Sequence, residues 1–291
     1  MYELIQVSEN SYYIQSPAKI GLVKLNENEV CLIDSGNDKD AGKKINKILN
    51  ANGWKLKAIY NTHSHADHIG GNQYLQAQTG CKIFAPGIES DYINHPILEP
   101  SFLYGGNPPK ELQHKFLMAK ESNAECLKKE DLPRGMEMIS LSGHSFDMVG
   151  FRTADDIVYL ADCLSGKETL DKYQIGFVYD VGTYLQTLEM VKNMKAKTFV
   201  PSHAEPTNDI VPLAQYNINK VMEIADKIVE ICKEPHTFED ILQKLFTLYE
   251  LQMNFEQYVL VGSTVKSYLT WLKENGRVKT EFERNKLIWK I

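Results

Sequence analysis

Three histidines and one aspartate lie within the six residues from His63 to His68, in the segment Asn61-Thr62-His63-Ser64-His65-Ala66-Asp67-His68. Imidazole nitrogen and carboxylate oxygen are donor atoms that Zn²⁺ accepts in proteins. A polar loop with helix-capping residues would explain one histidine, but not the pattern H-x-H-x-D-H directly after an apolar segment. The pattern therefore predicts a loop in which several side chains converge on a metal.

The elements on either side of this loop are expected to fix its position. Residues 56–60 are apolar enough for a buried strand, and residues 69–78 open with two glycines and then have a helical pattern. The histidines are therefore predicted to lie on a strand-to-helix loop, where their side chains can point toward one another.

Three further candidate ligands each follow a predicted strand. His144 follows the strand that ends at residue 141, Asp162 follows residues 157–160, and His203 follows residues 198–201. Cys163, beside Asp162, is interpreted as a packing residue rather than a ligand. A structural zinc site is disfavoured, because such sites are usually rich in cysteine.

The loop and these three residues, in this order, resemble the metallo-β-lactamase superfamily over about residues 15–205. The resemblance implies an α/β (α+β) fold, the four-layer αββα sandwich. It also implies that Asp34 supports the site without binding metal. By the same resemblance, one metal is held by His63, His65 and His144. The second metal is held by Asp67, His68 and His203, and Asp162 bridges both.

The expected chemistry is hydrolysis by two Zn²⁺ ions. Two ions about 4 Å apart can share a water and lower its pKa toward about 7, which supplies a metal-bridging hydroxide at neutral pH. Asp67 is the candidate catalytic residue, because its second oxygen could orient the hydroxide and pass a proton to the leaving group. Iron or manganese could replace zinc, since nitrogen and oxygen ligands do not exclude them.

Three functions are compatible with the predicted site for two metal ions. His65 stands where flavodiiron proteins carry a glutamate, and true β-lactamases lack the bridging aspartate, here Asp162. Persulfide dioxygenases do not use the full second site. Hydrolysis of a small ester, thioester or lactone is the leading function, as in enzymes resembling glyoxalase II. Cleavage of single-stranded RNA is the alternative, and a nucleic-acid-binding module with a vestigial metal site is the non-enzymatic one.

The composition favours a cytoplasmic protein with a small-molecule substrate. The 291 residues are 43% hydrophobic and 24% charged, with a net charge of -6 that argues weakly against bulk attraction to nucleic acid. Five scattered cysteines fit a reducing compartment. The sequence shows no signal peptide and no run of apolar residues that would span a membrane. It leaves the oligomeric state open.

Two domains are predicted, residues 1–208 and residues 209–291. The first is the catalytic domain, and its proline-rich and glycine-rich segment 86–130 is interpreted as an insertion or lid. The second has helices at 217–232, from 238 and at 263–273, then a hairpin, in the order of a winged helix. Residues 266–290 hold seven Lys or Arg against three Glu, so RNA is a possible partner. The alternative is that this region only packs beside the active site.

Overall fold

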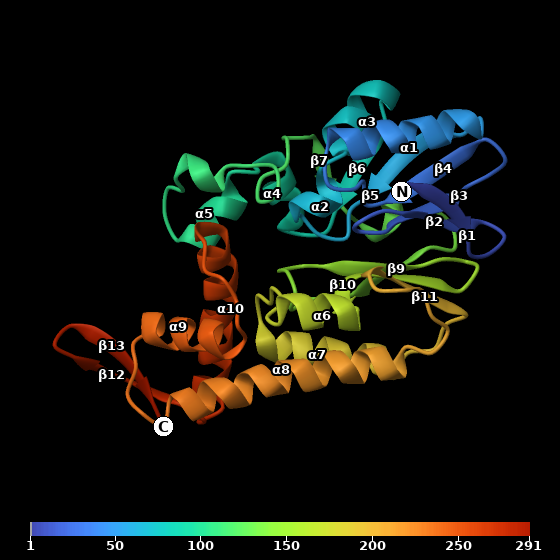
Figure 1. Ribbon diagram of the computed structural model, residues 1–291. Coiled ribbons are helices and arrows are strands. Elements are labelled where there is room, and N and C mark those ends of the chain that lie inside the picture. The colour runs from blue at the N-terminus through green and yellow to red at the C-terminus, as the bar shows by residue number, and fades with distance from the viewer. Residues whose placement is uncertain (1) are drawn as a thin grey trace.

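The computed structural model describes residues 2–291 and has two β-sheets packed between two layers of helices (Figure 1). This is the αββα sandwich that the resemblance implied. The first sheet has seven strands in the order of the chain. Its strands are β1 (Glu3–Gln6), β2 (Ser11–Gln15), β3 (Ile20–Lys24), β4 (Glu29–Ile33), β5 (Lys55–Tyr60), β6 (Lys82–Ala85) and β7 (Ala124–Cys126).

The direction of the strands in this sheet changes at β4. Neighbours from β1 to β4 are antiparallel, whereas β4 to β7 are parallel and need crossover connections. Helices α1 (Lys39–Ala51) and α3 (Asn72–Thr79) supply two of these crossovers and cover the outer face. The metal loop follows β5, at the carboxyl end of a parallel strand, where ligand sites of such sheets usually form.

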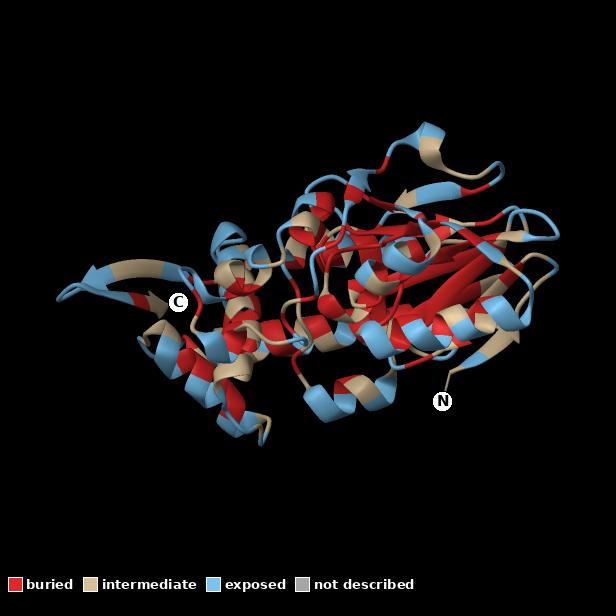
Figure 2. Ribbon diagram, turned by 90° about the horizontal axis from the view of Figure 1, so that it is seen from above, coloured by how far each residue is buried: buried red, intermediate tan, exposed pale blue. Residues whose placement is uncertain are grey.

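The second sheet has four strands in the order β11-β10-β9-β8. They are β8 (Glu137–Ser140), β9 (Val149–Arg152), β10 (Ile157–Ser165) and β11 (Thr198–His203). Helices α6 (Lys167–Tyr173), α7 (Val181–Lys192) and α8 (Val211–Ile231) lie below this sheet (Figure 1). A buried cluster that includes Tyr60, Phe151 and Tyr159 fills the space between the two sheets, and Figure 2 shows the strands as the most buried part of the molecule.

The last third of the chain is helical and ends in a hairpin, as expected. Helices α9 (Phe238–Leu248) and α10 (Phe255–Glu274) precede strands β12 (Lys279–Glu283) and β13 (Lys286–Lys290). Residues of α8, α9 and α10 share one hydrophobic cluster with β10 and α7. The boundary at residue 208 and the winged-helix character of this part remain predictions. Along the described residues, no helix has the length and apolar character needed to cross a membrane.

Segment 86–130 is more deeply built into the fold than a lid would be. It contains α4 (Glu89–Asn94), α5 (Leu98–Tyr104), two short 3₁₀ helices and strand β7, which pairs with β6. These elements were not predicted from the sequence: prolines and glycines interrupt the periodic pattern between residues 86 and 109, and β7 is only three residues long. Its β7 end belongs to the first sheet, and Glu89 is fully buried.

Several helices also differ from the prediction, among them α8, which begins at Val211 rather than at residue 217. The helix predicted at 69–78 is two helices, α2 (Ala66–Ile69) and α3. Helix α6 was not predicted, and α10 begins at Phe255 rather than at residue 263. The first turns of α10 contain β-branched and aromatic residues and Gly262, which are weak helix formers and hid its start. The side chain of Asn254 nevertheless caps that start, by accepting a hydrogen bond from the backbone N–H of Gln257.

Candidate active site

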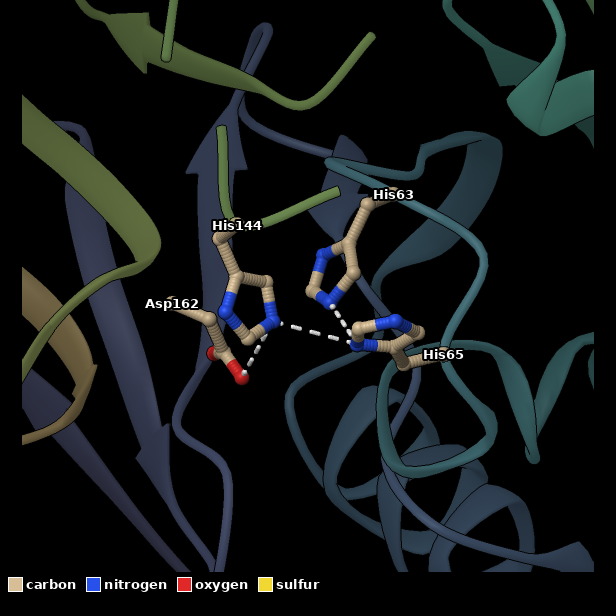
Figure 3. Close-up of side chains that lie close together, drawn as sticks. All are labelled: His63, His65, His144 and Asp162. Carbon is tan, nitrogen blue, oxygen red and sulfur yellow. Dashed lines mark hydrogen bonds and ion pairs between the residues drawn. The ribbon is translucent and has the colours of Figure 1, made fainter. Parts of the chain in front are cut away.

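Three of the predicted ligands converge through their ring nitrogens (Figure 3). His65 Nδ1 lies 3.0 Å from His63 Nε2 and 3.1 Å from His144 Nε2. His63 and His65 come from the loop after β5, whereas His144 comes from the loop between β8 and β9. The first predicted ligand group is therefore assembled from both sheets, and we call it the imidazole group.

The other three predicted ligands form a second group next to the first. His203 Nε2 at the end of β11 lies 3.3 Å from Asp67 Oδ2. His68 Nε2 lies 3.7 Å from the same carboxylate oxygen. We call these three residues the ionic group, because a carboxylate lies between two imidazoles.

Asp162 on β10 faces both groups. Its Oδ1 lies 2.9 Å from His68 Nε2, and its Oδ2 lies 3.2 Å from His203 Nε2 and 3.6 Å from His144 Nε2. Among the described residues, two sets of possible ligand atoms are compact enough to hold an ion, and Asp162 belongs to both. All seven residues predicted as ligands are thus brought together.

Two buried atoms show that these residues suit a cation. Nε2 of His68 and Oδ1 of Asp162 are close to each other, yet within residues 2–291 neither has a partner with hydrogen-bond geometry. The other nitrogen of His68, Nδ1, is 2.8 Å from Asp34 Oδ2, so Nε2 is the nitrogen left for a ligand. Buried polar atoms without partners are costly, and a bound metal ion would satisfy both.

Asp34 orients this part of the loop, as the resemblance implied. Its carboxylate is 2% exposed and accepts 2.8 Å hydrogen bonds from the backbone N–H and the hydroxyl of Thr62. The same carboxylate lies against His68. It therefore fixes the orientation of a ligand ring from behind, as carboxylates commonly do for metal-binding histidines.

The pKa values of the imidazole group are all lowered. Burial is the main cause, and it lowers the pKa of His65 and of His144 to about 4. Burial and the neighbouring His68 and His65 lower the pKa of His63 well below its usual value. These three rings are therefore neutral at pH 7, the protonation state in which imidazole binds metal.

The ionic group shows the opposite shifts. Burial works against the charged form of His203, but the adjacent Asp162 and Asp67 carboxylates raise the pKa of His203 to about 10. Burial likewise opposes the charge of Asp67, yet His68 and His203 lower the pKa of Asp67 to about 2. Opposite charges within about 4 Å outweigh desolvation at this group.

His144 is positioned by its own loop. Its Nδ1 lies 3.0 Å from the carbonyl oxygen of Phe177, which leaves Nε2 free to face the other histidines. Gly143 has a φ of +117°, and a Cβ at that position would collide with the backbone nitrogen of Tyr184. The glycine therefore lets the loop approach α7 closely enough to place His144.

A cavity of about 700 Å³ opens directly onto both ligand groups. Its walls come from α6 with the segment after it, and from the first half of α10. Apolar and polar side chains are mixed among the residues away from the ligands, and the apolar ones are Pro17, Leu170, Tyr173, Ile175, Phe177, Leu260 and Val261. Charged groups on these walls are Glu168, Lys172 and Glu256. A volume of this size suits a small ligand.

The candidate ligands were predicted from the sequence, but the residues around them were not. The cavity walls were missed because α6 and the start of α10 were not predicted. Two buried carboxylates in segment 86–130 were also missed. Glu99 on α5 lies 3.8 Å from His65 Nε2, and burial, with nearby Glu89, raises the pKa of Glu99 to about 8. Nothing in the local sequence distinguishes these two from surface glutamates.

A model of the metallo-beta-lactamase superfamily matches residues 8–203, which include every predicted ligand. The chain belongs to the metallo-beta-lactamase superfamily. The assembled ligand groups agree with this assignment. A vestigial site would be expected to lack ligands, and the presence of all seven argues against the non-enzymatic module.

Short segments of the chain match hydroxyacylglutathione hydrolases. The protein from Methylococcus capsulatus is 54% identical over 37 residues, which are 13% of this chain and 14% of that protein. The protein from Maricaulis maris is 49% identical over 41 residues, 14% of this chain and 16% of that protein. The matched segments thus span about a sixth of these relatives, and their activity is not transferred from this likeness alone.

Solved structures resemble the chain over its whole length. A metallo-beta-lactamase family protein from Thermus thermophilus has a TM-score of 0.73 at 14% identity and covers 100% of this chain and 98% of its own. A beta-lactamase domain protein from Burkholderia ambifaria has a TM-score of 0.75 at 15% identity, with 99% and 94% covered. These likenesses establish the fold.

Proposed function

We propose that the chain is a dinuclear zinc hydrolase that acts on a small ester, thioester or lactone. The observation that carries this proposal is that two ligand groups, joined by Asp162, open onto a cavity of about 700 Å³ with apolar and polar walls. Iron or manganese in place of zinc would be compatible with the same ligands.

The ligand groups would hold the two ions as the sequence analysis predicted. His63, His65 and His144 would bind one ion, and Asp67, His68 and His203 the other, with Asp162 between them. Two divalent ions held there would lower the pKa of a shared water and polarise the carbonyl oxygen of the substrate.

Asp67 is the residue that we propose moves the proton. Its side chain is 42% exposed, the most open of the carboxylates in the two groups, and it lines the cavity. Its Oδ2 faces His203 and His68, so Oδ1 is the oxygen that would take a proton from the attacking water. The same atom would then return the proton to the leaving group.

The cavity walls would bind the rest of the substrate and exclude water. Phe177 and Leu260 contribute apolar surface to the walls. The charged wall residues are one lysine, Lys172, and two glutamates. Walls with one positive and two negative side chains favour a substrate whose bound portion is uncharged. Polyanionic ligands would find little to neutralise them there.

Cleavage of single-stranded RNA remains the second candidate because of the terminal hairpin. Phe282 on β12 is 78% exposed, and the exposed Arg284 and Lys286 follow it. Exposed aromatic and basic side chains can stack on bases and contact phosphates. However, both views show the hairpin projecting from the side of α9 away from the sheets (Figures 1 and 2).

The distance along α10 also favours the small substrate. The cavity is lined by residues 256–264 of α10, whereas the hairpin follows its other end. From Leu260 to Glu274 the helix extends for about 20 Å at 1.5 Å per residue. RNA bound by the hairpin would have to cross this distance to reach the ligand groups.

A parallel activity screen tests the proposal. The zinc-loaded chain is assayed with thioester, ester, lactone, phosphodiester and RNA substrates, and its metal content is measured by elemental analysis. We expect close to two ions per chain and turnover of one of the first three classes. Turnover of RNA alone would replace the proposal by the second candidate, and zinc-supplemented protein without bound metal would refute both.

A further inference from the structure

Each of the two loops that form the imidazole group carries a serine directly after a histidine. Ser64 follows His63 on the loop from the first sheet, and Ser145 follows His144 on the loop from the second. Both hydroxyls donate hydrogen bonds to one carboxylate, that of Glu89 on α4. The two loops are therefore joined through a single side chain.

The two oxygens of Glu89 are divided between the two loops. Oε2 accepts from the hydroxyl of Ser64 and from its backbone N–H at 2.9 Å. Oε1 accepts from the hydroxyl of Ser145 and from the backbone N–H of Asp147 at 3.1 Å. Glu89 is 0% exposed, and these four neutral donors replace the water that a buried carboxylate loses.

We propose that Glu89 is a positioning residue that sets the separation of the two loops and thereby holds the three histidines in metal-binding geometry. The 3.1 Å approach of His144 Nε2 to His65 Nδ1 depends on how the two loops lie against each other. A carboxylate that holds both loops at once fixes this relation. The inference rests on the proposed function only in that these histidines bind metal.

A carboxylate is required because both of its oxygens accept. In Glu89→Gln, one oxygen becomes an NH₂ group that faces the backbone N–H of either Ser64 or Asp147. A serine hydroxyl can rotate and accept instead, but a backbone N–H cannot. The amide therefore holds one loop and releases the other, although its size is unchanged.

The test measures metal binding directly. The metal-stripped wild type, Glu89→Gln and the surface control Glu125→Gln are titrated with Zn²⁺ in competition with a chromophoric chelator, and their thermal unfolding is followed without metal. We expect Glu89→Gln to weaken one of the two binding steps by about 10- to 100-fold, as losses of ligand-supporting residues do. Glu125→Gln, on exposed β7 of the same segment, should match the wild type.

A double-mutant cycle shows through which group Glu89 acts. His144→Ala removes one ligand of the imidazole group, so adding Glu89→Gln should then cost little further affinity. Adding His203→Ala to Glu89→Gln should instead give additive losses, because His203 is a member of the ionic group. If Glu89 only stabilises the fold, Glu89→Gln should lower the unfolding temperature and weaken both zinc-binding steps alike. That result, or an unchanged zinc affinity, would overturn the inference.

The role of Glu89 can be tested even if the proposed hydrolysis is not found, and even if Glu89→Gln does not fold. If the wild type binds two ions but hydrolyses none of the substrates in the screen, the proposed function fails while the binding test of Glu89 still decides its role. If Glu89→Gln does not fold, Ser145→Ala removes one donor to Oε1. It should give a smaller loss at the same step, and unchanged affinity in Ser145→Ala would then count against Glu89.

Discussion

The imidazole group and the ionic group are held together by different forces. His63, His65 and His144 are neutral rings whose pKa values burial has lowered, so no charge draws them together before metal binds. Asp67, His68 and His203 carry opposite charges, which attract one another. The first group therefore depends on outside supports such as the Phe177 carbonyl, whereas the second is partly self-assembled.

The location of the two groups reinforces this contrast. The imidazole group spans loops of both sheets, and Glu89 joins those loops from segment 86–130. The ionic group also joins the two sheets, because His203 ends β11, but there the attraction between His203 and Asp67 acts across the gap, and Asp34 holds His68 from within the first sheet. Changes between the sheets should thus disturb the first group more, and changes within the first sheet should disturb the second.

The largest effect is expected for Asp162→Ala, which removes the residue common to both groups. Metal content should fall from about two ions to one or fewer, and hydrolysis should drop by more than about 100-fold, beyond the loss of a supporting residue. Elemental analysis and steady-state kinetics measure these changes. Wild-type turnover in Asp162→Ala would show that the two groups do not share this ligand.

A smaller, one-sided loss is expected for Asp34→Asn. One of the two oxygens becomes an NH₂ group, which then faces either the Thr62 backbone N–H or both the Thr62 hydroxyl and His68 Nδ1. The affinity of the ionic group should fall by about 10- to 100-fold, and the imidazole group, which Asp34 reaches only through the Thr62 hydroxyl beside His63, should lose less. Competition titration of Zn²⁺ resolves the two steps. Asp226→Asn, which alters an exposed ion pair with Arg277, is the matched control, and equal weakening of both steps would contradict the contrast drawn here.

A change in the cavity wall should affect substrate binding and neither ligand group. Leu260→Trp fills part of the cavity, and crowding that costs about 1–3 kcal/mol would raise KM by about tenfold or more. Metal content should stay at the wild-type level. Leu248→Trp, on the exposed face of α9, is the control, and an unchanged KM in Leu260→Trp would place the substrate elsewhere.

The smallest effect is expected at the basic hairpin. Changing Lys279, Arg284 and Lys286 together to Ala should leave hydrolysis of a small ester and both metal affinities unchanged. If the chain cleaves RNA instead, the same triple change should cripple that cleavage and lower the salt dependence of binding by up to about 1 per lost contact. RNA binding and ester hydrolysis measured in parallel distinguish the two outcomes.

The sequence alone determined the ligands, because their chemistry lies in residue type and local spacing. H-x-H-x-D-H follows the strand β5 that the apolar run predicted, His144 follows β8 and His203 ends β11. Asp162 lies within β10, which continues past its predicted end to Ser165. The order of these positions along the chain was sufficient to indicate the superfamily and its four-layer sandwich. The strands that precede the candidate ligands were therefore confirmed.

Only the tertiary structure decided what surrounds those ligands. Glu89 and Glu99 look like ordinary polar residues in a segment rich in prolines, and their burial depends on contacts with loops far away in the chain. The cavity walls formed by α6 and by the first turns of α10 are likewise non-local. Weak helix formers begin α10, and packing rather than local preference makes that segment helical.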